Sequence, residues 1–221
     1  IHCGLVGSEM CIRDRSTNAN VRPNINLSST GDVNFTGTGT TTTYSGSISG
    51  SGNLNKTGNG TVILSGSNSY TGSTKVGAGT LRVDSTNSVP SNNTLVSSGG
   101  TYNVNSSVEL AGLSGSGGIS IQSGTLTLNN SSNETFSGII SGSGGFTKNG
   151  SGSFTLLNNN TYTGATTISG GELTAKGLLG NTNISLASGT ILGFDAGDDT
   201  IGAISGSCLL YTSDAADEVS W

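Results

Sequence analysis

The chain has 221 residues, of which Gly, Ser, Thr and Asn make up 127, and it contains 31% hydrophobic, 10% charged and 5% aromatic residues. So low a hydrophobic fraction argues against a thick core of packed helices, and two prolines with so little charge argue against an ordinary disordered tail. The net charge of −5 offers no basic face for nucleic acid, and no apolar run approaches the roughly 18 residues of a membrane-spanning helix.

The two ends differ from the rest of the chain, because they hold all its rarest residues: His2, Cys3, Met10, Cys11, Cys208 and Trp221. A disulfide between the ends is one interpretation. A codon-level comparison favours another. Residues 9–15 can be encoded by a DNA stretch whose reverse complement, read in another frame, encodes residues 208–213. That DNA element is similar to the transposase end used in sequencing libraries. We therefore interpret 1–15 and 207–221 as adapter-derived and non-biological. Finding both stretches in genomic DNA sequenced by another chemistry would overturn this interpretation.

The remaining segment, 16–206, has no Cys, His, Met or Trp, and its 6 basic and 8 acidic residues give a net charge of −2. A cysteine-free chain is compatible with a route through an oxidising compartment. Without His or Cys, the segment cannot build a Ser-His-Asp or Cys-His catalytic group.

Internal repetition is the strongest pattern in 16–206. Residues 46–83 align with 138–175 at a constant offset of 92, without gaps, and 17 of 38 positions are identical. A degenerate third copy occupies 114–138, and 44–46 resembles the tail of a fourth. A period of this kind predicts a repeat architecture.

Alternating apolar residues such as Val62 and Leu64, bounded by Gly and Asn, predict strands of about 3–5 residues separated by tight turns. Pro23 and Pro90 fall in polar connections, where a missing N–H is tolerated. The chain is therefore expected to be all-β.

A sandwich, a propeller and a β-solenoid are the competing arrangements. A thin core with small turn residues favours the solenoid. Tyr44 and Tyr70, like Phe136 and Tyr162, are 26 residues apart, which we interpret as one coil plus a corner loop. Strands stacked about 4.8 Å apart would then give roughly eight or nine coils and a rod of about 40 Å. Since neither end of 16–206 shows a capping repeat, we expect a fragment.

Each full copy contains the frame S-G-x-G-x-[LF]-x-K-x-G-x-G-x-[VF]-x-L-x-[GN]-x-N-x-Y-T-G-x-T. This frame resembles the autotransporter-associated β-strand repeat, found in passenger domains of bacterial type V secretion proteins. The resemblance implies a right-handed parallel β-helix at the cell surface or released from it, exported through an outer-membrane translocator barrel. The third copy lacks the Lys and has Phe136 in place of Tyr.

Acidic residues offer little chemistry. Glu109, Glu134 and Glu172 are single and widely spaced, so paired carboxylates for sugar hydrolysis are not expected and we interpret them as solvated. Oxygen ligands at Asp195, Asp198 and Asp199 would suit calcium, but their spacing matches neither an EF-hand loop nor the glycine-rich nonapeptide calcium repeat, and a solvated turn is favoured.

Three groups within the frame have two interpretations each. Lys56 and Lys148 are expected to cap carbonyls or to discourage edge pairing rather than to bind a ligand. Tyr70 and Tyr162 are expected to stack at coil corners, with an exposed glycan-binding patch as the alternative. The residues 158–160, all Asn, form either an amide ladder or a plain loop.

The leading functional hypothesis is a structural or adhesive segment of an exported surface protein, with a host or glycan surface ligand as a possible partner. No catalytic, cofactor-binding or metal-binding residue is assigned. One alternative is a β-helical polysaccharide-degrading enzyme, for which Arg22, Arg82 and scattered Glu supply no constellation. The other is a secretion and folding aid with no ligand of its own.

Overall fold

Short strands separated by turns make up the whole described chain in a computed structural model, which describes residues 2–6, 9–13, 20–21, 24–27, 31–176, 179, 182–194, 203–206 and 209–212. These residues contain no helix. In chain order the strands are β1 (His2–Val6), β2 (Glu9–Arg13), β3 (Asn20–Val21), β4 (Ile25–Leu27), β5 (Val33–Phe35), β6 (Thr41–Tyr44), β7 (Ile48–Gly50), β8 (Leu54–Lys56), β9 (Thr61–Leu64), β10 (Thr74–Val83), β11 (Asn93–Val104), β12 (Val108–Leu110), β13 (Gly112–Gly115), β14 (Gly118–Ile121), β15 (Thr125–Leu128), β16 (Glu134–Phe136), β17 (Ile139–Gly142), β18 (Gly145–Lys148), β19 (Ser153–Leu156), β20 (Thr166–Ile168), β21 (Glu172–Ala175), β22 (Ile184–Leu186), β23 (Ile191–Phe194), β24 (Ile204–Gly206) and β25 (Leu209–Thr212).

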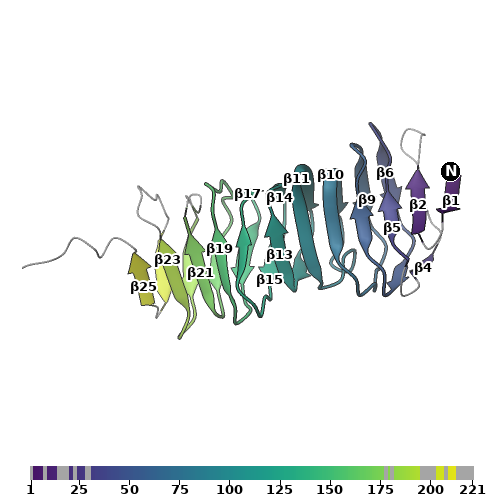
Figure 1. Cartoon of the computed structure of the whole chain (residues 1–221). Helices are drawn as coiled ribbons and strands as arrows, with labels where there is room; N and C mark the ends of the chain where they lie inside the picture. Colours follow the sequence, from purple (N-terminus) through teal and green to yellow (C-terminus); the bar gives the residue numbers. More distant parts are fainter. Residues whose placement is uncertain are drawn as a thin grey trace, which may run out of the picture.

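The strands stack in parallel along one axis, so the chain is a β-solenoid, as the sequence predicts (Figure 1). Among the described strands the antiparallel pair β1–β2 is the exception. Adapter origin of the ends stays a prediction; their strands β2 and β25 pair with β5 and β23.

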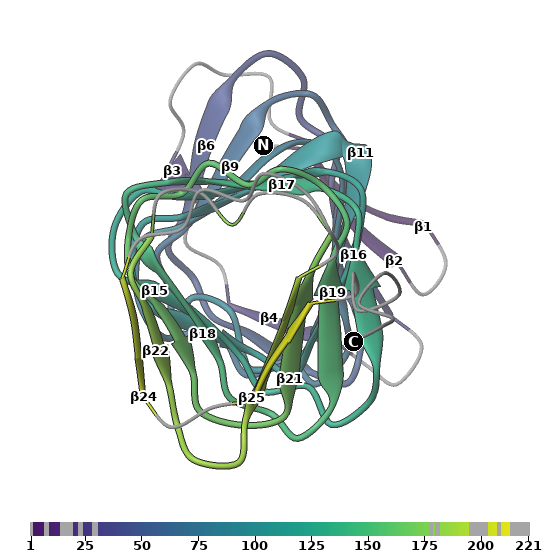
Figure 2. The ribbon, with the colours of Figure 1, turned by 90° about the vertical axis from the view of Figure 1, so that its left-hand side faces the viewer.

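Seen along the axis, the coil has three faces (Figure 2). The first face stacks β2, β5, β8, the starts of β10 and β11, β13, β16, β19, β21, β23 and β25. The second stacks β3, β6, β9, the ends of β10 and β11, β14 and β17. The third holds the pair β4–β7 and the set β12, β15, β18, β20, β22 and β24.

The length of one turn follows from the strand register. Thr101 pairs with Gly118 and Ile25 with Ile48, so a turn takes between 17 and 23 residues. The 26-residue spacing of Tyr44 and Tyr70 is one coil plus a corner, as expected, because Tyr44 stacks on Leu64 one turn later and Tyr70 lies on the following face. From β5 to β23 the first face carries nine strands, which enclose eight turns.

Two strands are longer than the expected 3–5 residues. β10 has 10 residues and β11 has 12. Each runs around the corner between the first and second faces, and the register shifts between Val76 and Ala78 at that corner. Each of β10 and β11 therefore consists of a first-face strand and a second-face strand joined without a break.

The core is a thin column inside the coil. Along the second face Tyr44, Leu64, Val83, Val104 and Ile121 stack directly on one another, all 0% exposed. Alternate residues point outward, because successive side chains of a strand lie on opposite sides. Burying each such side chain contributes about 1.5–3 kcal/mol, which lets a chain with few hydrophobic residues fold.

Gly142 illustrates why corners need glycine. Its φ is +105°, and a Cβ there would lie 2.1 Å from the carbonyl oxygen of Ile121 on the previous turn. Gly189 has φ +79°, but a Cβ at that position would have no other atom within 4 Å. We expect Gly142→Ala to lower the free energy of unfolding by about 3 kcal/mol and Gly189→Ala by about 1 kcal/mol, because only the former also forces two turns apart. Urea titration followed by circular dichroism measures both, and equal losses would contradict the expectation.

The 92-residue offset is not a whole number of turns. Lys56 lies on the first face, in β8, whereas Lys148 lies on the third, in β18. The two copies of the repeat are therefore rotated relative to each other about the axis.

Candidate functional site

The two lysines of the repeat frame are buried between turns, both 0% exposed. Each Nζ donates a hydrogen bond to the carbonyl oxygen two residues ahead and to one on the next turn. The second acceptor is Ala78 for Lys56, at 3.0 Å, and Gly170 for Lys148, at 3.2 Å. The predicted carbonyl-capping role is confirmed. The alternative of discouraging edge pairing was wrong, since β8 and β18 each have a strand on both sides.

Burial without a counter-ion weakens the charged form of these lysines. Desolvation lowers the pKa of each to about 8, and Glu134 opposes the shift at Lys148. The one ion pair among the described residues is Arg82–Asp84, at 2.6 Å. A lowered pKa is also typical of lysines that act as nucleophiles. Here, however, both side chains are buried and bond to backbone carbonyl oxygens.

Tyr70 and Tyr162 are also internal, at 1% and 0% exposure, so the idea of an exposed aromatic patch was wrong and the stacking interpretation holds. Each hydroxyl lies 2.7 Å from a threonine Oγ1, on Thr74 and Thr166 respectively. Tyr162 also packs edge-on against Phe146, with ring centroids 6.3 Å apart. Burial raises the pKa of Tyr162 to about 12 and shifts that of Tyr70 further in the same direction.

The asparagines of the frame bridge neighbouring turns. Asn68 Oδ1 accepts the N–H of Ile48 at 2.7 Å, and Asn160 Oδ1 accepts that of Ile140 at 2.9 Å. Asn158, by contrast, is exposed and donates to the carbonyl of Ser137. Amide-to-amide bonds join neighbouring turns in Asn55–Asn34 and Asn149–Asn129.

The acidic candidates are dispersed over the described turns. Glu109 is exposed and accepts from Asn129 Nδ2 at 3.4 Å. Glu172 accepts from the Thr174 hydroxyl at 3.0 Å. Glu134 was wrongly taken as merely solvated: it is half-buried and its Oε2 accepts the N–H of Leu113 at 2.8 Å, which joins two turns.

The acidic cluster at Asp195, Asp198 and Asp199, like Arg22 and Pro23, lies outside the described residues. Within the described ones, no group of three or more His, Cys, Asp or Glu is placed to hold a metal ion. None of the described segments forms a helix long and apolar enough to cross a membrane.

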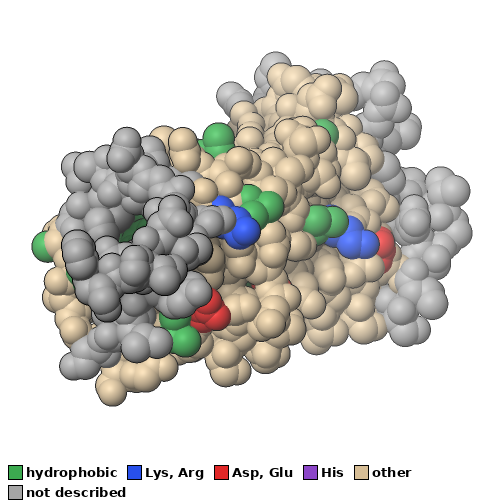
Figure 3. Space-filling view, turned by 60° about the vertical axis from the view of Figure 1, so that its left-hand side comes forward, with side chains coloured by type: hydrophobic (Ala, Val, Ile, Leu, Met, Phe, Trp, Pro, Cys, Tyr) green, Lys and Arg blue, Asp and Glu red, His purple; other side chains and the backbone are tan. Residues whose placement is uncertain are grey.

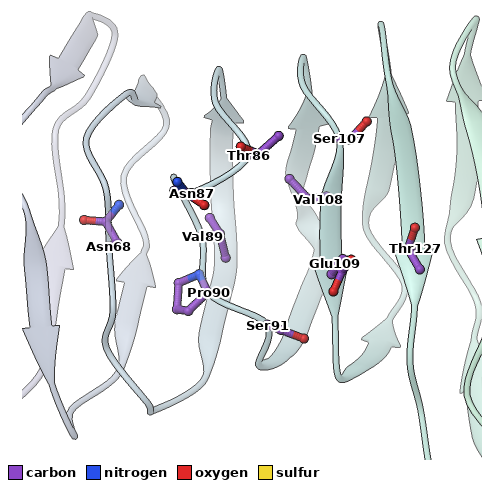
Figure 4. A pocket seen from close by; sticks show the side chains of 10 residues that line it. All are labelled: Asn68, Thr86, Asn87, Val89, Pro90, Ser91, Ser107, Val108, Glu109 and Thr127. Atoms are coloured by element: carbon purple, nitrogen blue, oxygen red, sulfur yellow. The ribbon is translucent and has the colours of Figure 1, made fainter.

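An open groove lies on the third face of the described chain. It has a volume of about 430 Å³. Figure 4 shows a loop and two successive strands bordering it. Its lining residues are Asn68, Thr86, Asn87, Val89, Pro90, Ser91, Ser107, Val108, Glu109 and Thr127. Hydroxyls, amides and one carboxylate dominate, which suits hydrogen bonding rather than apolar binding.

Sequence reasoning missed this groove. It named Pro90 only as a loop residue and Glu109 only as solvated. The signal available was indirect: residues 84–92 lack the strand alternation that precedes and follows them.

On the side seen in Figure 3, the described hydrophobic, basic and acidic side chains form only small groups among polar side chains and backbone. Among described residues the large exposed hydrophobic side chains are Leu95, Ile139, Leu157 and Ile204.

Comparison with known proteins agrees with the parallel solenoid and its repeat frame. Residues 54–83 and 146–175 match the passenger-associated-transport-repeat family. The chain therefore contains two copies of this passenger-associated repeat. Over 193 residues, 83% of this chain, it is 36% identical to the adhesin BmaC autotransporter of Brucella suis biovar 1 (strain 1330). The chain spans 6% of the length of that relative. No solved structure matches it. The similarity supports an exported location, on the cell surface, at the outer membrane or released.

Proposed function

We propose that this segment is a rigid stalk within an exported surface passenger, and that it presents its outer loops for adhesion. The proposal rests on the positions at which the two repeat copies have the same residue. Their shared large side chains are buried in both copies, and in the first copy these are Ile48, Lys56, Leu64, Asn68, Tyr70, Thr74 and Leu81. The common residues with large apolar, amide or ammonium side chains thus serve the interior and preserve the shape of the coil, whereas Thr71 and its equivalent Thr163 are common but exposed.

The similarity to an autotransporter adhesin supports an outer-membrane translocator as the partner during export and a host or glycan surface as the ligand of the whole protein. It also favours a non-enzymatic role. A polysaccharide-degrading function would need two carboxylates about 5–10 Å apart, and the described glutamates lie on separate turns bonded to separate partners. The remaining alternative is an aid to secretion that binds nothing.

Deletion of one full turn tests the stalk. Gly118 pairs with Ile139, so removing 118–138 joins equivalent positions and leaves 54–83 and 146–175 intact. We expect the full-length protein with this deletion to reach the cell surface at the parental level and to keep its protease resistance, because every remaining strand finds a neighbour of the same face.

The matched control removes 118–128 instead, which takes out β14 and β15 but not β16. That deletion moves every later strand to the wrong face, and surface display should fall at least tenfold. Equal display of both deletions would refute a register-dependent rod. If removal of the whole segment reduced display but left the adhesion of each displayed molecule unchanged, the segment would be a secretion aid.

A further inference from the structure

The third face contains a gap in its stack of strands, and the groove lies at this gap. β7 is followed on the next turn by an irregular segment that still bonds to it, through Ser69 N–H to Ile48 O at 2.7 Å and Thr71 N–H to Gly50 O at 2.8 Å. The turn after that passes the third face at residues 88–91 as a loop, and only then does β12 begin.

β12 consequently has one edge without a strand. It pairs with β15, and the Leu110 carbonyl accepts from the Asn129 N–H at 2.7 Å on that side. In a parallel ladder, alternate residues bond to opposite neighbours, so the N–H and C=O of Glu109 point the other way, toward the groove. Across the gap, the Ala111 N–H donates to Asn92 O at 3.1 Å. Glu109 forms no such backbone hydrogen bond with the described loop residues 88–91.

The loop opposite this edge cannot complete the ladder. Pro90 has no N–H to donate. Its neighbour Val89 is only 3% exposed, so its side chain packs into the core and holds the loop in place beside β12. The groove that remains has about 430 Å³, within the range of ligand pockets.

We propose that this groove binds an extended peptide segment of a partner protein, which adds as a strand to the edge of β12 and places a lysine or arginine against Glu109. Strand addition uses the main-chain groups of an exposed edge for affinity and alternate side chains for specificity. The Glu109 carboxylate is exposed, has no ion pair among the described residues and bonds only to the Asn129 amide at 3.4 Å. A basic side chain complements it.

A glycan is the less favoured occupant. Sugars stack on exposed aromatic rings, whereas the groove is lined by none. The tyrosines nearest in sequence, Tyr70 and Tyr102, are 1% and 0% exposed. Peptide binding in this groove is independent of the stalk role. It is measured on the purified chain, so its result does not depend on the result of the export experiments.

The test uses the full 221-residue chain, labelled with ¹⁵N, and the end-blocked peptide Thr-Val-Lys-Val-Thr. We expect saturable shifts of the backbone amide signals of Glu109 and its groove neighbours. The same peptide with its three central amides N-methylated should bind at least tenfold more weakly, because it cannot form a ladder. Glu109→Gln should weaken binding of the lysine peptide at least threefold, whereas Glu172→Gln, the same change on another face, should leave it unchanged.

Three results would overturn the proposal: N-methylation without effect, equal binding by the Glu109→Gln variant, or no peptide binding. If a panel of oligosaccharides shifted the same amides while the peptide did not, the groove would be a glycan site instead.

Discussion

The free energy of unfolding should rise between pH 8 and pH 9.5. Burial lowers the pKa of Lys56 and Lys148 to about 8 in the folded chain, against 10.5 for an ordinary lysine. Between these values the unfolded chain holds more protons, so stability increases with pH across this window and is flat below it. The expected gain is on the order of 1–2 kcal/mol for each lysine. Urea titrations at a series of pH values measure it.

The window ends where the buried tyrosines begin to oppose the gain. Burial raises the pKa of Tyr162 from 10.0 to about 12, so above pH 10 the unfolded chain loses protons first and stability falls again. Lys148→Met removes one of the two contributions, and the rise from pH 8 to 9.5 should then be about half as large. An unchanged rise in that variant would show that the lysines are not its source.

Phe146→Ala should be among the most destabilising single changes in the second copy. The Phe146 ring is 0% exposed and lies 6.0 Å from the Phe154 ring and 6.3 Å from the Tyr162 ring, measured between centroids. Its removal leaves a cavity between two faces of a core that is only one side chain deep. We expect a loss of about 3–5 kcal/mol in the free energy of unfolding, followed by circular dichroism in urea.

The first copy offers a matched comparison, because Leu54 occupies the position of Phe146 there and is also 0% exposed. Phe146→Leu restores the residue of the first copy and should cost less than about 2 kcal/mol, chiefly through the two lost ring contacts. Should Phe146→Ala cost no more than Phe146→Leu, the thin core would be more adaptable than its packing indicates.

The solenoid could be predicted from the sequence because the residues that recur in the repeat frame are largely those that the coil buries. Val62 and Leu64 alternate, and the structure buries both. Lys56 and Lys148 recur at the same position in the frame, and both cap carbonyls as expected. Local patterns of this kind are fixed by contacts within one turn and its neighbour, which an alignment of the two copies can reveal.

Other features depend on where distant residues meet, which the pattern does not contain. The rotation between the two copies was not predicted, because an offset of 92 residues does not reveal that Lys56 and Lys148 lie on different faces. The tyrosines of the frame were given a surface alternative because tyrosine suits either environment. The groove brings together Asn68, Pro90, Glu109 and Thr127 from separate turns, and its edge exists only because no strand forms at 88–91.

The rotation between the two repeat copies limits how partners can meet this rod. The outer residues of the first copy and the corresponding residues of the second point in different directions around the axis, since Lys56 and Lys148 belong to different faces. A flat surface, such as a membrane or a mineral, touches one side of a straight rod and thus meets one copy at a time. A partner that engages both copies through the same contacts has to wind around the rod.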